Sequence, residues 1–290
     1  MERPRIVAEI GCNHRGQLKT AEEMIRVAAE VCKVDVVKFQ KRHPRESLTP
    51  EQYQAPHPVP HNSYGATYGA HREALELGVE VHQRLHDLCQ VCGVVYSSSV
   101  WDMTSARQIV DLNPTMIKVP SACNTHFQML DYLCHRFGGE LHISLGMTTR
   151  QEEEHIINLL LQRQRLKDTV LYACVSGYPV DFKDLCLLEI ERLCRDYGSE
   201  AKSIGFSGHH LGIAADIAAM TLGARWIERH YTLDRTWKGT DHAASLEPDG
   251  LRRLVRDVHH VWQALRSKPT DLLPVEIPQR QKLKQMTTLT

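Results

Sequence analysis

A regular alternation between short apolar runs and segments with helical spacing constrains the fold of this chain more than any other feature. Eight runs are predicted to be strands: residues 6–10, 34–39, 94–98, 116–119, 141–144, 170–174, 203–207 and 225–230. Continuous apolar runs are typical of parallel strands that are buried on both faces. Strands that alternate with helices favour an α/β fold. The sequence therefore predicts a single (β/α)8 TIM barrel, for which 290 residues are sufficient.

Eight helical segments follow these strands, and several carry local start signals. The predicted helices are residues 20–31, 73–92, 103–111, 125–136, 149–163, 185–197, 213–222 and 248–265. Thr20 and Thr149 each begin a capping box with an acidic residue three positions later, and Pro248 suits a first helical turn. Residues 40–69 show little periodicity and are predicted to be a long loop, either a functional lid or a disordered segment. We expect a barrel domain over residues 1–267 and a surface tail over 268–290.

Charge and composition narrow the classes of partner. Lysine plus arginine and aspartate plus glutamate both number 35, which argues against nucleic acid or an anionic membrane as the main partner. The N-terminus has no secretory signal pattern, and no apolar run reaches the ~18 residues that a membrane-spanning helix needs. The nine cysteines are scattered without framework spacing, as expected for reduced thiols. We therefore predict a soluble cytoplasmic protein that acts on small molecules.

Polar side chains stand at or near the end of every predicted strand. They are Glu9, Lys38, Gln40, Ser97, Ser98, Lys118, Ser121, Ser144, Cys174, Ser176, Ser207, His209, Glu228 and His230. In a TIM barrel the catalytic groups come from the carboxyl ends of several strands, so these side chains should converge on one pocket. A single histidine or serine at a strand end is usually an ordinary loop residue, and the prediction rests on the convergence of the whole set.

Two histidines and two lysines indicate the chemistry of this pocket. His209 and His230 follow neighbouring strands and should emerge at the same end of the sheet, close enough to share one divalent metal ion. Lys38 and Lys118 lie within apolar strands, where a buried ammonium needs an anion. That anion is either a substrate phosphate or carboxylate, or a carboxylate of the barrel itself. Spacing alone predicts a metal-assisted enzyme that acts on a phosphorylated, carboxylated or carbonyl substrate.

Seven short motifs occur in order along the chain. They are residues 9–16 (EIGCNHRG), 37–40 (VKFQ), 144–147 (SLGM), 178–179 (YP), 205–209 (GFSGH), 228–234 (ERHYTLD) and 241–248 (DHAASLEP). Together they resemble the N-acetylneuraminate (sialic acid) synthase family, and the resemblance runs from about residue 5 to residue 265. The family condenses phosphoenolpyruvate with an aldose, such as N-acetylmannosamine, to give a 2-keto-3-deoxy sugar acid and inorganic phosphate, using a divalent metal.

The resemblance implies a role for each matching residue. His209 and His230 are expected to bind the metal, with manganese favoured and magnesium or cobalt as alternatives, and the metal activates the aldehyde of the open-chain sugar. The phosphoenolpyruvate subsite is expected to contain Lys38, Gln40, Ser98, Lys118, Ser144 and Ser207. The catalytic set is expected to contain Glu9, Lys38, Lys118, Tyr178, Glu228 and Asp241. A homodimer is the expected assembly.

Departures from the family pattern bear on the sugar substrate. Where the family usually reads Ser-Asp-His, this chain has Gly208 in the middle, and where the family has an acidic residue after the fourth strand, it has Cys123. Both changes remove negative charge from the part of the site that would bind the sugar. We expect Gly208 to make the choice of sugar differ from that of the family. The C-terminal antifreeze-like domain of sialic acid synthases is also expected to be lacking, so that another segment, such as residues 40–69, would close the acceptor subsite.

Two other functions are compatible with the sequence. A related synthase of the octulosonate or heptulosonate type would take a phosphorylated or shorter aldose, and Arg42, Arg45 and Arg72 near the long loop are candidates to hold its distal phosphate. A non-catalytic barrel would keep the fold for ligand binding or assembly without turnover. The retention of both lysines and both histidines argues against that second alternative.

Overall fold

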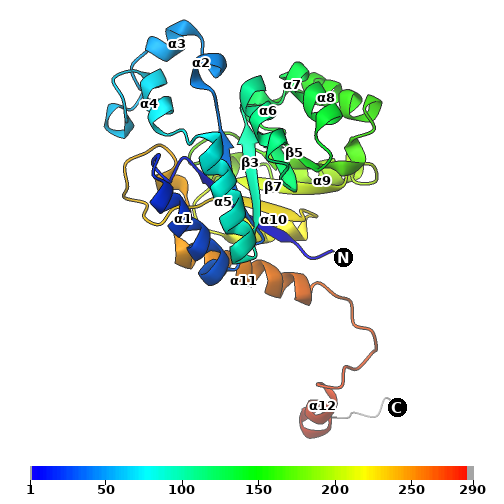
Figure 1. Ribbon diagram of the computed structural model, residues 1–290. Coiled ribbons are helices and arrows are strands. Elements are labelled where there is room, and N and C mark those ends of the chain that lie inside the picture. The colour runs from blue at the N-terminus through cyan, green and yellow to red at the C-terminus, as the bar shows by residue number, and fades with distance from the viewer. Residues whose placement is uncertain (1, 286–290) are drawn as a thin grey trace.

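Eight parallel strands pair in sequence order and close into a barrel in the computed structural model, which describes residues 2–285 (Figure 1). The strands are β1 (Arg5–Gly11), β2 (Val36–Lys41), β3 (Val95–Val100), β4 (Met116–Val119), β5 (Glu140–Ser144), β6 (Thr169–Cys174), β7 (Ser203–Gly208) and β8 (Trp226–His230). Pairing of β1 with β8, in which Glu9 lies beside His230, closes the barrel. The predicted (β/α)8 TIM barrel is therefore confirmed.

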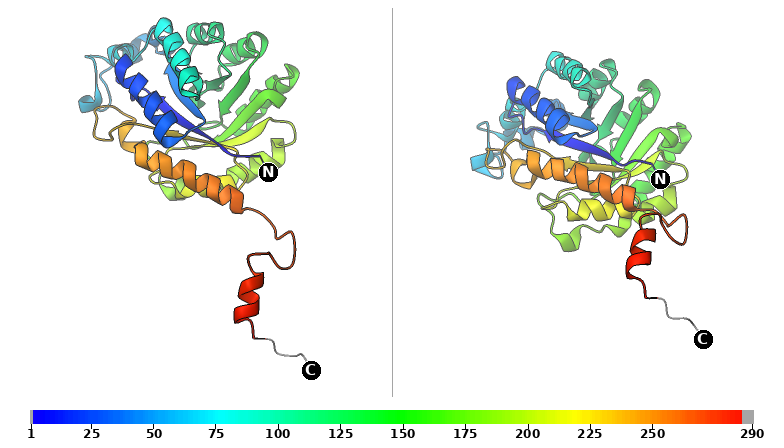
Figure 2. Two further views of the ribbon diagram at one scale, coloured as in Figure 1. Left: turned by 60° about the horizontal axis from the view of Figure 1, so that its bottom comes forward. Right: turned by 90° about the horizontal axis from the view of Figure 1, so that it is seen from below.

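Helices follow the strands and cover the outside of the barrel (Figures 1 and 2). They are α1 (Leu18–Arg26), α5 (Val79–Cys92), α6 (Met103–Asp111), α7 (Phe127–Arg136), α8 (Arg150–Gln162), α9 (Leu188–Tyr197), α10 (Ala214–Thr221) and α11 (Pro248–Ala264). A π-helical turn, Val27–Cys32, continues α1. The Thr149 capping box at the start of α8 and the proline in the first turn of α11 occur as predicted.

The two faces of each strand divide the interior into separate layers, because successive side chains in a strand point to opposite sides. Outward residues such as Ile6 and Phe39 pack against the helices in the main hydrophobic core. Inward residues near the start of the strands form a second apolar cluster, the floor of the barrel, which consists of Val7, Val36, Met116, Val170, Tyr172 and Trp226. Inward residues further along the strands are polar, so any site must lie at the carboxyl ends.

Several predicted helix boundaries are wrong, among them the starts of α7, at Phe127 instead of residue 125, and of α9, at Leu188 instead of residue 185. The helix expected over 73–92 is two helices, α4 (Tyr68–Ala74) and α5, because the chain is extended at Gly78, the N-cap of α5. The first helix begins at Leu18 instead of Thr20. The Thr20 hydroxyl donates to the Gln17 side chain at 3.1 Å and caps no backbone group. The apolar pattern of residues 73–92 thus runs across a break between two helices, whereas the predicted first helix starts two residues late.

The segment predicted as a long loop, residues 40–69, is largely ordered. It contains α2 (Pro44–Ser47), α3 (Pro50–Gln54) and a 3₁₀ turn at Pro60–Asn62. These elements gather with α4 beyond the carboxyl end of β2 (Figure 1). The buried imidazoles of His57 and His71 pack edge to face there, with ring centroids 4.4 Å apart. Their contact makes the segment a small packed unit at the mouth of the barrel.

The predicted surface tail leaves the barrel after α11 and carries one short helix, α12 (Ile277–Leu283) (Figures 1 and 2). Residues 286–290 of the predicted tail lie outside the described residues. Among residues 2–285, no helix combines the length and the hydropathy required to cross a bilayer.

A buried ion pair joins β8 to α10. Arg229 is 1% exposed and its guanidinium lies 2.5 Å from the Asp216 carboxylate, which is itself fully buried. The same guanidinium donates to the carbonyl of Gly212 at 2.7 Å and to the carbonyl of His210. These bonds hold the loop after β7 against the strand that ends in His230.

Asp216→Ala is expected to destabilise the protein by about 3–5 kcal/mol, because it leaves the Arg229 guanidinium buried without its counter-charge. Urea unfolding at pH 7 measures the loss. Asp249→Ala is the matched control, since Asp249 pairs with Arg252 and Arg253 on the exposed surface of α11, where ion pairs contribute little. Equal losses in the two variants would contradict the structural role of the buried pair.

Candidate active site

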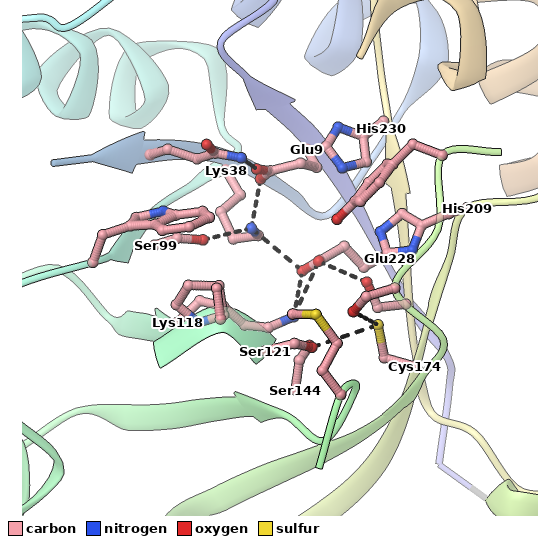
Figure 3. Close-up of a pocket in the computed structure, with 18 residues that line it drawn as sticks. Glu9, Lys38, Ser99, Lys118, Ser121, Ser144, Cys174, His209, Glu228 and His230 are labelled. Atoms are coloured by element: carbon pink, nitrogen blue, oxygen red, sulfur yellow. Dashed lines mark hydrogen bonds and ion pairs between the residues drawn. The ribbon is translucent and has the colours of Figure 1, made fainter. Parts of the chain in front are cut away.

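One cavity opens at the carboxyl ends of the strands, and every strand of the barrel contributes to it (Figure 3). Its volume is about 220 Å³. The lining residues are Glu9, Lys38, Gln40, Ser99, Trp101, Lys118, Pro120, Ser121, Ala122, Ser144, Met147, Cys174, Ser176, Tyr178, Ser207, His209, Glu228 and His230. The convergence that the strand ends predicted is therefore present.

Two lysines and two glutamates form a buried charge cluster at the base of the cavity (Figure 3). Lys38 Nζ lies 2.6 Å from Glu9 Oε2, 2.8 Å from Ser99 Oγ and 3.7 Å from Glu228 Oε2. Lys118 Nζ donates to both carboxylate oxygens of Glu228, at 3.0 and 2.9 Å. The anions that the buried lysines require are thus supplied by the barrel itself.

The electrostatics of the cluster favour the charged forms of Glu228 and Lys38. Burial opposes ionisation of Glu228, but Lys118 and Lys38 lower the pKa of its carboxyl well below the usual range. Burial also opposes the charge of Lys38, yet Glu228 and Glu9 raise the pKa of its ammonium. Burial raises the pKa of Glu9 and lowers that of Lys118, against the opposing effects of Lys38 and Glu228. The cluster has no net charge whether Glu9 and Lys118 are both charged or both neutral. An anionic ligand needs additional positive charge or a proton to bind there.

His209 and His230 stand at the rim of the cavity with ring centroids 5.5 Å apart (Figure 3). His209 Nδ1 lies 3.0 Å from the carbonyl oxygen of Val175 and donates to it. Burial opposes a positive charge on this ring, but its contacts with the Cys174 thiol and the Val175 carbonyl raise the pKa of His209. His230 Nδ1 is buried and has no hydrogen-bond partner among residues 2–285. Burial lowers the pKa of His230 to about 4, against the opposing effect of Asp241, so the ring is neutral at pH 7.

These two imidazoles fit a divalent metal ion. Metal ligation requires a neutral ring with a free nitrogen, and a carbonyl that accepts from the other nitrogen fixes the orientation of a ligating histidine. Within residues 2–285 no group of three His, Cys, Asp or Glu side chains converges as a complete metal site. An ion held by His209 and His230 would therefore keep open positions for water or substrate, as catalytic sites do.

The structure brings most of the predicted site residues together. Glu9, Lys38, Gln40, Lys118, Ser144, Tyr178, Ser207, His209, Glu228 and His230 all line the cavity. Asp241 lies just outside it, with its carboxylate 3.8 Å from His230 Nδ1. Ser98 is wrongly placed in the predicted subsite, because it pairs with Phe39 on the outward face of the sheet. Its neighbour Ser99 points inward and bonds to Lys38 instead.

Two expectations about substrate choice are also corrected. A side chain at position 208 would point toward Phe206 and His210, since a Cβ there would lie 2.8 and 2.9 Å from atoms of those rings. Position 208 therefore faces the helix layer and not the cavity. Cys123, the other departure from the family pattern, does not line the cavity either, although its neighbour Ala122 does.

The candidate arginines for a distal phosphate do not line this cavity. Arg42 is buried over the Trp101 ring, with its guanidinium 4.0 Å from the ring centroid. Arg45 pairs with Glu73, and Arg72 donates to the Tyr68 hydroxyl.

Several lining residues were not assigned a role from the sequence. Ser121, Cys174 and Ser176 belong to the predicted strand ends, but Ser99, Trp101 and Met147 do not. The strand predicted to end at residue 98 continues to Val100, and alternation from the inward-facing Ser97 would have identified Ser99. The indole N–H of Trp101 is buried and unpartnered among residues 2–285, so it is available to a ligand.

A closed (β/α)8 barrel with ionisable groups gathered at the carboxyl ends of its strands has the architecture of a barrel enzyme. Residues 24–270 match the NeuB family. This chain belongs to the NeuB family, and the resemblance seen in its motifs is confirmed.

Relatives with synthase names cover nearly the whole chain. The N-acetylneuraminate-9-phosphate synthases of Mus musculus and Homo sapiens are each 36% identical over 96% of this chain and 76% of their own length. An N,N'-diacetyllegionaminic acid synthase of Campylobacter jejuni is 29% identical over 91% of the chain and 78% of its own length. The crystal structure of a sialic acid synthetase from Leptospira borgpetersenii, in complex with citrate, has a TM-score of 0.80 at 26% identity and covers 97% of this chain and 93% of its own.

The charge cluster predicts a strong coupling between Lys118 and Glu228. Lys118→Met and Glu228→Gln alone are each expected to cost about 3 kcal/mol of unfolding free energy, because each leaves its partner buried and less well paired. The double variant should cost clearly less than the sum of the two, because no orphaned charge remains from this pair. Urea unfolding of all four proteins measures the coupling, and strictly additive losses would contradict it.

Proposed function

We propose that this protein condenses phosphoenolpyruvate with an aldose in a metal-dependent reaction, giving a 2-keto-3-deoxy sugar acid of the nonulosonic type and inorganic phosphate. The observation that carries the proposal is the single cavity in which two imidazoles face two buried lysines and a set of serine hydroxyls. Such a cavity offers a cation site beside an anion site. Membership of the NeuB family supports the same reaction class.

Phosphoenolpyruvate is proposed to bind at the base of the cavity. Its phosphate and carboxylate would accept hydrogen bonds from Lys38 and Lys118 and from the hydroxyls of Ser144 and Ser207. Ser121 and Gln40 line the same region and supply further polar contacts. Because Glu9 and Glu228 neutralise both lysines, the multiply charged substrate requires more positive charge than the side chains provide.

A divalent metal, with manganese favoured over magnesium or cobalt, would be held by His209 and His230, where it adds positive charge and acts as a Lewis acid toward the aldehyde oxygen. The protein's own groups orient the histidines and shape the mouth of the cavity. The Val175 carbonyl orients His209, and Tyr178 packs over that ring with centroids 4.4 Å apart, which narrows the mouth of the cavity.

The proposed reaction forms one carbon–carbon bond and, at C2, forms a carbon–oxygen bond to water and breaks the carbon–oxygen bond to phosphate. C3 of phosphoenolpyruvate attacks the aldehyde carbon, water adds at C2, and the tetrahedral centre at C2 expels phosphate to leave the ketone. Lys38 and Lys118 stabilise negative charge on the departing phosphate by fixed hydrogen bonds. Glu9, Glu228, Tyr178 and Asp241 are the candidates to orient the water and sugar hydroxyls or to move protons at the mouth.

The phosphorylation state of the acceptor defines a second candidate within the same class. The mouse and human relatives are named for a 9-phosphate product, which favours an aldose with a distal phosphate. The Campylobacter relative is named for a product without phosphate. The cavity's own cations, Lys38 and Lys118, are paired at its base, so a distal phosphate would have to be bound outside the lining set.

Phosphate release from phosphoenolpyruvate tests the proposed function directly. The panel contains N-acetylmannosamine, its 6-phosphate, and four- and five-carbon aldose phosphates, each with manganese and with a chelator. We expect phosphate release with only one of the two N-acetylmannosamine compounds, and we expect chelation to abolish that release. The product mass should equal the mass of the aldose plus that of pyruvic acid. No release with any aldose, together with no manganese-dependent binding of phosphoenolpyruvate by calorimetry, would favour a non-catalytic barrel.

His209→Ala and His230→Ala are each expected to weaken manganese binding by at least about tenfold and to abolish turnover, with melting temperatures within a few degrees of the wild type. Calorimetric titration with manganese measures the first effect. His135→Ala, on the exposed side of α7, is the matched control and should bind manganese normally. A collapse of the fold in the His209 and His230 variants would instead indicate structural histidines.

A further inference from the structure

The aromatic ring of Tyr172 lies directly against the ammonium of Lys118. The Lys118 nitrogen is 3.7 Å from the ring centroid, and both residues are buried inside the barrel. Tyr172 belongs to the apolar floor, whereas Lys118 belongs to the charge cluster above it. This contact is therefore where the packed floor of the barrel meets the polar cavity.

The surroundings of Tyr172 hold its ring in this position. Its hydroxyl lies 2.8 Å from Nδ1 of His142, and the His142 ring packs edge to face on Trp226 with centroids 4.6 Å apart. Gly205 on the neighbouring strand makes room for the phenol, because a Cβ there would lie 2.6 Å from Tyr172 Cε1. A tyrosine fixed at its hydroxyl and along one edge of its ring has little freedom to turn away from the lysine.

The Tyr172 ring adds a cation–π contact to the hydrogen bonds of Lys118. Two of its hydrogen bonds go to the Glu228 carboxylate. Burial lowers the pKa of Lys118 in spite of that carboxylate, so the ammonium needs further stabilisation to remain charged. The negative face of an aromatic ring stabilises a desolvated cation.

We propose that Tyr172 is a positioning residue for phosphoenolpyruvate binding: its ring holds the Lys118 ammonium at the base of the cavity, in the charged state and direction that an anionic substrate requires. This inference rests on the proposed function, and it deepens it by extending the anion site into the floor of the barrel. His142, Trp226 and Gly205 act through Tyr172 by fixing the ring. Tyr172 itself does not line the cavity.

A second tyrosine–histidine pair in the same protein provides a matched control. Tyr96 is buried on the outward face of β3, and its hydroxyl lies 2.7 Å from Nδ1 of His82. It stacks on Phe39 in the helix layer, with ring centroids 5.9 Å apart. Tyr96 thus has the burial and the hydrogen bond of Tyr172 without a lysine over its ring.

The experiment compares Tyr172→Leu and Tyr172→Phe with Tyr96→Leu and Tyr96→Phe in the full chain. Steady-state kinetics, with the aldose that supports phosphate release in the panel assay, give the KM for each substrate. Calorimetry gives the Kd for phosphoenolpyruvate in the presence of manganese, and melting temperatures report stability. We expect Tyr172→Leu to raise the KM and Kd for phosphoenolpyruvate about tenfold or more, with the aldose KM within about threefold of the wild type. Tyr172→Phe keeps the ring, so its KM values for phosphoenolpyruvate and for the aldose should both stay within about threefold of the wild type.

Each outcome decides between distinct explanations. Equal effects of Tyr172→Leu and Tyr96→Leu on the phosphoenolpyruvate KM, at equal melting temperatures, would overturn the positioning role and leave the proposed function intact. An equal rise of the phosphoenolpyruvate KM in Tyr172→Phe and Tyr172→Leu would also overturn the positioning role, because Tyr172→Phe retains the aromatic ring. A wild-type protein that neither turns over nor binds phosphoenolpyruvate would overturn the proposed function together with this inference.

Discussion

The buried charge cluster on the axis of the barrel is the interaction on which the rest of the site depends. Two lysines and two glutamates are tolerable inside a protein only as a mutually paired set, since an unpaired buried charge is costly. Lys118 bonds to both oxygens of Glu228, and Lys38 lies between Glu228 and Glu9. The set arises from β1, β2, β4 and β8, so it can form only once the barrel has closed. Closure and site assembly are therefore the same event.

The layered interior explains how such a cluster is kept stable and accessible at once. Below it, the apolar floor and the Tyr172 ring exclude water and hold the ammonium of Lys118. Above it, the strands end in hydroxyl and imidazole groups that face the cavity. His209 and His230 line the same cavity as the lysines, and His230 Nδ1 has no hydrogen-bond partner among residues 2–285. A barrel of parallel strands makes this division naturally, because the inward residues of alternate strands stack in successive layers along the barrel.

Where prediction from sequence was inaccurate, the reason was local. The alternation of apolar runs and helical spacing identified all eight strands and the order of the main helices, because burial on both faces leaves a strong periodic signal. The pattern did not reveal the break before Gly78, where the apolar spacing continues although the helix does not. It also placed the end of β3 two residues early, which exchanged Ser98 for Ser99 at the cavity. In a strand, an error of one residue selects the opposite face.

By itself, the sequence determined the barrel, the chemical types of the groups at its strand ends, and the family to which the chain belongs. These properties follow from residue type and order, which a linear pattern contains. Only the tertiary structure decided that the lysines are neutralised by Glu9 and Glu228, that position 208 faces the helices, and that Tyr172 supports Lys118. Those facts depend on register and on distances between strands far apart in the chain. No local sequence pattern encodes such distances.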